Sequence, residues 1–138
     1  MSGAFIGSDP IQISPVPDNS YAPATIWLDD NDKYIVAWNK QRRYHYAALI
    51  DQSFDIIQNN LLINKCSMNY SGYIKPSLVF DGNNFLSVSL LGYPVDCHLF
   101  TPSGAPVDTV TRFCCDASQD DEVAYGTDNY LVVWKNWG

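Results

Sequence analysis

The chain has 138 residues, of which 46% are hydrophobic and 14% aromatic, and its formal net charge is −7. This length and hydrophobic content suffice for one domain with an ordinary core, so they exclude a wholly disordered chain. No apolar run approaches the roughly 20 residues of a membrane-spanning helix, and the acidic surface would repel phosphate backbones. We therefore expect neither membrane insertion nor nucleic acid as a partner.

The N-terminal residues lack the basic region and the long apolar stretch of a signal peptide, so the sequence assigns no compartment. Two short apolar segments follow each other here, one at 2–7 and one at 9–14. Aromatic and β-branched residues are frequent throughout the chain, which favours strands over helices. We therefore predict that residues 1–14 form two strands joined by a short turn.

Three later segments share one pattern: a short apolar run, a turn rich in Asp, Asn or Gly, and an aromatic residue that opens a second apolar run. They are Thr25–Trp38, Ser77–Ser89 and Glu122–Trp134. The pattern predicts a β-hairpin. Because it returns every 45 to 51 residues, it also indicates a repeat architecture.

A further pair of apolar segments follows each of the first two hairpins. Tyr46–Asp51 precedes a segment centred on Leu62 and Ile63, and Asp96–Thr101 precedes one centred on Arg112 and Phe113. The complete unit therefore has four strands. In chain order the sequence predicts two complete units, at 22–66 and 74–115, and a third unit divided between 121–138 (its first two strands) and 1–14 (its last two).

The hairpins resemble the blades of bacterial β-propeller proteins, whose repeat runs Pro-x-hydrophobic-x-aromatic-Asp-Gly-x-Asn-Tyr-Leu-Val-Val-Trp. The matching residues are Pro76–Leu86 and Asp128–Trp134. The first hairpin departs from this pattern with Asp30-Asn31-Asp32 in place of Asp-Gly, and Gly126-Thr127 reverses the third turn. The resemblance implies an all-β fold of four-stranded antiparallel propeller blades. It implies no particular activity, since such blades occur in proteins of many functions.

A propeller closes with roughly four to eight blades around its axis, and this chain holds three blades' worth of strands. We therefore expect residues 1–138 to form a single half-propeller domain. A homodimer with two-fold symmetry would complete six blades, with the hairpin at 121–138 of one chain paired to the strands at 1–14 of the other. The expected partner is thus the chain itself, by strand exchange.

The sequence predicts no metal site and no cofactor. The acidic residues that cluster sit in hairpin turns, where an Asp side chain caps its own backbone; they are Asp29, Asp30, Asp32 and Asp81. The calcium-loop pattern with its distal Glu is missing, and the cysteines lack the C-x-x-C spacing of zinc sites. A G-x-S-x-G elbow and a Gly-rich phosphate loop are missing as well, so no catalytic residue is assigned.

Four cysteines occur, at Cys66, Cys97, Cys114 and Cys115. One interpretation makes them small buried apolar residues in a reducing compartment, and we favour it over disulfides. Their spacing leaves the disulfide state open.

Aromatic residues supply the candidate binding site. Those at equivalent places of the hairpins are interpreted as sheet-to-sheet core: Tyr34, Trp38, Phe85, Tyr130 and Trp134. Others fall at unrepeated or loop positions, where flat rings beside polar groups suit stacking on sugars or insertion into a protein partner. The expected binding residues are Trp27, Arg42, Tyr44, Tyr73, Tyr93 and Trp137. The alternative for each is an ordinary, partly buried loop residue.

Three functions remain open from the sequence. The first is a non-enzymatic recognition module, lectin-like for glycan or binding to protein, and it is the one that we expect. The second is a hydrolase with its site in the central channel. The third is a structural or assembly subunit.

Overall fold

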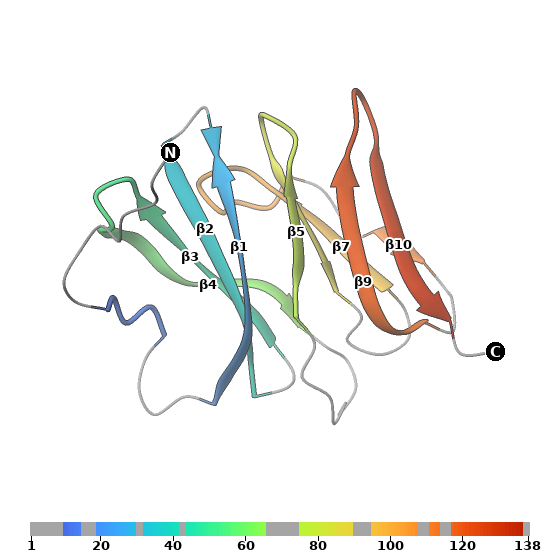
Figure 1. The fold of residues 1–138 in the computed structure, drawn as a ribbon, viewed down its shortest axis with the longest axis horizontal. Coiled ribbons are helices and arrows are strands. Elements are labelled where there is room, and N and C mark those ends of the chain that lie inside the picture. Colours follow the sequence, from blue (N-terminus) through green and yellow to red (C-terminus); the bar gives the residue numbers. More distant parts are fainter. Residues whose placement is uncertain are drawn as a thin grey trace, which may run out of the picture.

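The computed structural model describes residues 10–14, 19–29, 32–41, 44–65, 75–89, 95–107, 111–113 and 117–136. These residues form an all-β fold with antiparallel sheets (Figure 1), which confirms the prediction of an all-β, antiparallel protein. Three bodies stand side by side: a first sheet, a second sheet and a C-terminal hairpin. No helix among the described residues has the length and apolar character needed to cross a membrane.

The first sheet has four strands in the order in which they occur along the chain, namely β1 (Ser20–Leu28), β2 (Lys33–Lys40), β3 (Tyr44–Asp51) and β4 (Ile56–Lys65). Both faces of β2 carry apolar side chains, so this strand can be buried on two sides. β1 is an edge strand, and it tolerates Pro23 because a bulge between Tyr21 and Ala24 interrupts the ladder there.

The second sheet repeats this order with β5 (Ser77–Phe80), β6 (Phe85–Ser89), β7 (Val95–Phe100) and β8 (Thr111–Phe113). The C-terminal hairpin consists of β9 (Ala117–Tyr125) and β10 (Tyr130–Asn136). The turn between β5 and β6 needs Gly82, whose φ of 97° is unfavourable for residues with a Cβ.

The three predicted hairpins are present, and they pair in corresponding registers. A pair of aromatic residues faces across each hairpin next to its turn: Trp27 with Tyr34, Phe80 with Phe85, and Tyr125 with Tyr130. Because side chains alternate along a strand, this common register puts corresponding residues on corresponding faces.

Two apolar clusters hold the three bodies together. The first lies between the two sheets and is built around Leu28, Ile35 and Leu49 from one side and Phe85 and Phe100 from the other. The second lies between the second sheet and the hairpin. In Figure 1 β1, β5 and β9 stand next to one another, and β5 contacts both of the other two strands.

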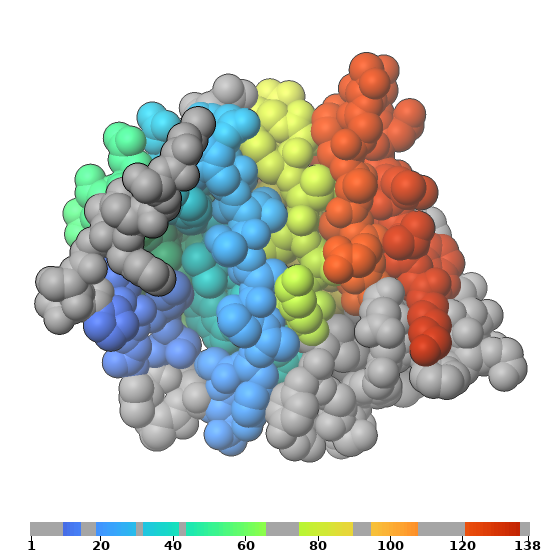
Figure 2. Space-filling model, viewed as in Figure 1, coloured from blue at the N-terminus to red at the C-terminus, as the bar shows by residue number. Residues whose placement is uncertain are grey.

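Residues 10–14 were expected to form the last strand of the divided unit. In the structure they belong to no strand. They lie against one face of the first sheet, at the end of the molecule opposite the C-terminal hairpin (Figure 2). A strand needs a free sheet edge beside it, and in the prediction that edge is supplied by a second copy of the chain. Residues 1–9 lie outside the described part. Ring closure and strand exchange therefore stay predictions.

Phe85 tests the packing between the two sheets. Its ring is fully buried and stacks on Phe100 with the centroids 5.2 Å apart. Replacing Phe85 with Ala should lower the free energy of unfolding by about 3–5 kcal/mol, because the cavity lies between sheets that cannot fully collapse. Urea unfolding followed by tryptophan fluorescence measures this loss.

The matched control is Ile57→Ala on β4, where the side chain is 50% exposed. This change should alter the free energy of unfolding by no more than about 0.5 kcal/mol. Equal effects of the two substitutions would contradict the placement of Phe85 in the core.

Candidate functional site

The outward face of the first sheet gathers the largest group of aromatic side chains in the described part of the chain. On β2, Ile35 and Ala37 point to the second sheet, so Tyr34, Val36 and Trp38 point the other way. Neighbouring strands and one turn add further rings to the same side. We call this surface the aromatic face; its rings are Trp27, Tyr34, Trp38, Tyr44, Tyr46 and Phe54.

These rings contact one another in two groups. Next to the hairpin turn, the ring centroids of Trp27 and Tyr34 are 4.5 Å apart, and Phe54 stacks on Tyr34 at 6.1 Å. At the other end of the sheet, Tyr46 lies 6.4 Å from Trp38 and 6.2 Å from Tyr44. Such aromatic pairs are worth roughly 0.5–1.5 kcal/mol beyond their buried area, so they hold the face in one shape.

Two lysines border the second group. Nζ of Lys40 lies 5.1 Å from the centroid of the Tyr46 ring, and Nζ of Lys65 lies 6.0 Å from that of Tyr44. Both distances are within the range of cation–π attraction. This end of the aromatic face therefore carries two lysines in a protein whose net charge is −7.

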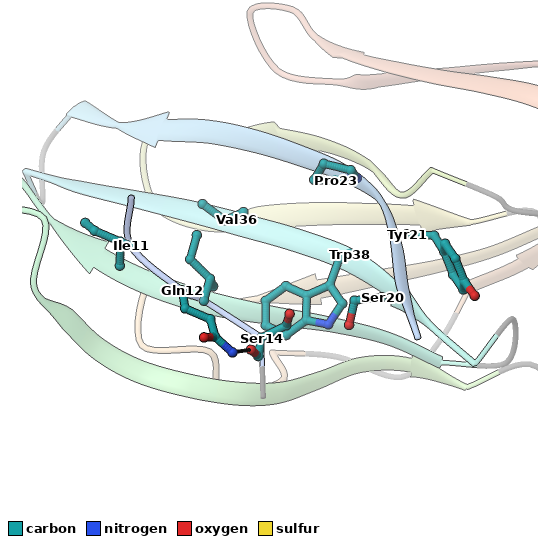
Figure 3. A pocket seen from close by; sticks show the side chains of 9 residues that line it. Ile11, Gln12, Ser14, Ser20, Tyr21, Pro23, Val36 and Trp38 are labelled. Atoms are coloured by element: carbon teal, nitrogen blue, oxygen red, sulfur yellow. Dashed lines mark hydrogen bonds between the residues drawn. The ribbon is translucent and has the colours of Figure 1, made fainter. Parts of the chain in front are cut away.

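Residues 10–14 cover the middle of the aromatic face without filling it. Between this segment and β1–β2 lies a hollow of about 340 Å³, and a second hollow of about 240 Å³ adjoins it. Figure 3 shows Ile11, Gln12 and Ser14 on one side of the larger hollow and Trp38 on the other. The Gln12 side-chain amide donates to the carbonyl of Ser14 at 2.9 Å.

Two of the predicted binding residues lie on this face, at opposite ends of the sheet. Trp27 is 36% exposed at the end of β1, and Tyr44 begins β3. Arg42, Tyr73, Tyr93 and Trp137 lie outside the described residues, so their placement is not tested. Tyr34 and Trp38, which the sequence predicted as core between sheets, face away from the second sheet. Trp38 is buried nevertheless, at 4% exposed, and Tyr34 is half-buried. The signal for their side of the sheet is that the first unit of the described chain has no neighbouring sheet there.

Asp81 has a structural role, as the sequence predicted for carboxylates in turns. Its Oδ1 accepts hydrogen bonds from the backbone amides of Asn83 and Asn84, at 2.7 Å and 2.6 Å. Its Oδ2 accepts one from the hydroxyl of Tyr130 in the C-terminal hairpin. Burial raises the pKa of this carboxyl, but the hydrogen bonds outweigh burial and leave the pKa below its ordinary value of 3.8. Burial and the Asp81 carboxylate raise the pKa of Tyr130.

Two reactive side chains of the described residues, Cys97 and His45, are buried. Burial, and then the charges of Asp96 and Asp121, raise the pKa of the Cys97 thiol to about 11, so the nucleophilic thiolate is disfavoured. Cys97 is a buried free thiol, and His45 is completely buried. Cys66, Cys114 and Cys115 lie outside the described residues. No group of three or more His, Cys, Asp or Glu within the described ranges could hold a metal ion.

A layer of polar side chains lies between the two sheets, near the C-terminal ends of β2 and β6. Asn39, Ser87 and Ser89 are fully buried there, and the Asn64 side-chain amide donates to the hydroxyl of Ser89. The hydrogen bond between Asn64 and Ser89 joins the two sheets. Because solvent does not reach this layer, a ligand cannot enter it.

Comparison with known proteins adds no relative. No protein family matches the chain, and neither a curated protein nor a solved structure is significantly similar to it. The site must therefore be interpreted from its own geometry.

The Tyr130–Asp81 hydrogen bond should make a pH-dependent contribution to stability. The lowered pKa of Asp81 adds stability that is present above about pH 4 and is lost as the pH falls through the folded value. The raised pKa of Tyr130 adds stability that is present below about pH 10 and is lost as the pH rises through the folded value. Tyr130→Phe should thus lower the free energy of unfolding most between about pH 5 and pH 9.

Urea unfolding at pH 3, 7 and 10.5 measures this dependence. Tyr125→Phe is the matched control, because its hydroxyl reaches only the carbonyl of Thr127, at 3.3 Å. A Tyr130→Phe effect that stays constant across the three pH values would show that the hydroxyl does not act through Asp81.

Proposed function

We propose that this protein is a non-enzymatic recognition module built on β-propeller blades, and that the aromatic face is its binding surface. The observation that carries the proposal is the gathering of six aromatic rings on one outward sheet face, with hollows beside them. Large rigid rings are the side chains that most often dominate binding energy at protein interfaces.

The lining of the hollows favours a polypeptide over a sugar. The smaller hollow is bordered almost entirely by apolar side chains, among them Ile11, Val36 and Ile50. In the larger one, the Gln12 amide is already engaged with Ser14. Ser20 Oγ and Trp38 Nε1 have no hydrogen-bond partner among the described residues, and they could pair with a peptide carbonyl as well as with a hydroxyl group. A sugar ring needs polar partners for its hydroxyl groups as well as a flat ring to stack on, since unpaired polar groups are costly to desolvate. An apolar protein surface has no such requirement.

The blade assignment is supported by the antiparallel four-stranded sheets and by the arrangement of their first strands. β1, β5 and β9 adjoin one another, as strands do that line a common axis. The sequence resemblance of the hairpins agrees with this arrangement. Under this proposal the rigid scaffold presents the aromatic face, and the hydrolase hypothesis gains no support from the described carboxylates.

Trp27→Ala tests the aromatic face as a binding surface. Two immobilised probes are used, a panel of neutral and acidic glycans and the chain itself. We expect binding to the chain and a loss of at least tenfold in affinity for Trp27→Ala, because truncating an aromatic anchor costs about 2 kcal/mol or more. Surface plasmon resonance measures the dissociation constants.

Tyr125→Ala is the matched control, since Tyr125 is 37% exposed and lies off the aromatic face, paired with Tyr130 on the side of the C-terminal hairpin that faces the second sheet. It should keep the wild-type affinity. Glycan binding that is lost in Trp27→Ala would indicate a lectin instead of a protein-binding module. Wild-type affinity of Trp27→Ala for every bound probe would refute the aromatic face as the recognition surface.

A further inference from the structure

The chain contains the same joint between neighbouring bodies twice. In the first joint, Ile35 and Ala37 of β2 belong to the cluster that packs on Phe85. In the second joint, Leu86 and Val88 of β6 belong to the cluster that packs on the hairpin. In both joints, one body contributes the side of its second hairpin strand that does not carry the aromatic residue next to the turn. The next body contributes the side that does carry this aromatic residue.

Corresponding residues can be identified from the hairpin registers. The aromatic residue next to the turn opens the second strand of each hairpin, as Tyr34, Phe85 or Tyr130. The residue after it and the residue two further on therefore share one side of the strand. They are Ile35 and Ala37 in the first sheet, Leu86 and Val88 in the second, and Leu131 and Val133 in the C-terminal hairpin.

The exposure of these residues separates the last body from the other two. Ile35 is 0% and Leu86 is 7% exposed, whereas Leu131 is 63% exposed. At the next position Val88 is fully buried, but Val133 is 50% exposed. Leu131 and Val133 thus form an outer face of the hairpin that corresponds to one surface of a joint. Within the described chain, no neighbouring body packs against it.

The missing half is present at the other end of the molecule. The side of β10 that packs on the second sheet carries Tyr130, Val132 and Trp134. The corresponding residues of β2 are Tyr34, Val36 and Trp38, which belong to the aromatic face. The aromatic face therefore offers the same side-chain types, at the same places, as the surface that closes the second joint.

We propose that the aromatic face binds the outer face of the C-terminal hairpin of a second copy of this chain. This inference rests on the proposed function, and it names the partner of the same surface. One chain cannot join its own two faces, because the second sheet stands between them (Figure 1). A second copy brings its hairpin to the aromatic face, whose middle is covered by residues 10–14, so Ile11 and Ile13 shift or share in the contact.

The joint is head to tail, since it unites two different surfaces. Each of two copies has one face of each kind, so two identical joints close a two-fold assembly without leaving either face exposed. Ile11 and Ile13 lie on the aromatic face beside Val36, so they belong to the same apolar contact. Its centre would then be as apolar as the two joints within the chain.

Val133→Asp tests the side of the joint that the C-terminal hairpin contributes. Sedimentation velocity of the 138-residue chain should give twice the 15.5 kDa mass of one copy. Val133→Asp should raise the dissociation constant at least tenfold, because the carboxylate would be buried without a partner. Val107→Asp is the matched control, since Val107 is 46% exposed and lies outside both faces, and it should sediment as wild type.

Mixing two variants tests the direction of the joint. Val36→Asp blocks the aromatic face and leaves the hairpin intact, and Thr25→Asp, at an exposed position opposite Val36, replaces it if Val36→Asp does not fold. Each variant alone should be monomeric. A mixture with Val133→Asp should form a two-copy species held by one intact joint, which a symmetric like-to-like contact would not produce.

The possible failures are distinct. A monomeric wild-type chain, a Val133→Asp dimer as tight as wild type, or no mixed species at the highest protein concentration would each overturn the second-copy inference. The proposed function would survive a monomeric wild type if a glycan bound and Trp27→Ala abolished that binding. The proposed function would be refuted if Trp27→Ala bound every probe as tightly as the wild type does, whatever the oligomeric state of the chain.

Discussion

The structure depends on one constraint: its sheets are apolar on both faces, and each face must be covered. A sheet with one apolar face can pack on a single layer, but a sheet with two needs a neighbour on each side. The second sheet meets this need within the chain, because the first sheet covers one side and the C-terminal hairpin covers the other. The outer two bodies each have one apolar face without a sheet packed on it. That of the hairpin is exposed at Leu131 and Val133, and that of the first sheet is covered in its middle by residues 10–14. The site and the assembly both follow from that.

The open faces differ in chemistry because the two sides of each sheet differ. One side carries short aliphatic residues such as Leu131 and Val133, and the other carries rings such as Tyr34 and Trp38. Aliphatic and aromatic side chains pack together in the joint within the chain, where Leu86 and Val88 share one apolar cluster with Tyr130, Val132 and Trp134 of the hairpin. Residues 10–14 cover the aromatic face only partly, and they leave hollows that an aliphatic surface could fill. The polar layer around Asn39 and Ser87 lies inside the joint between the sheets and takes no part in this contact.

The sequence predicted the strands well, since their signals are local. Asp81 caps the turn that Gly82 permits, and alternation fixes which residues share a side of a strand. Placement of the aromatic residues could not be predicted with the same success. The rings of Tyr34 and Phe85 occupy corresponding positions, yet Phe85 is buried between sheets and Tyr34 lies on the outside. Whether a position is core or surface depends on the neighbour of its sheet, and no local pattern contains that information. Residues 10–14 illustrate the same limit, because an apolar alternating segment without an adjacent edge lies on a face instead of joining a ladder.

The central claim is that Leu131 of one copy packs against Tyr34 of another in solution, although Leu131 is 63% exposed in the single chain. Hydroxyl-radical footprinting across a range of protein concentrations, with peptide mass spectrometry, tests this claim most directly. Ile57, which is 50% exposed on β4, serves as the internal reference. We predict that Leu131 and Tyr34 become protected together as the concentration rises, while Ile57 stays reactive. Labelling of Leu131 that remains as fast as that of Ile57 at every concentration would contradict the account.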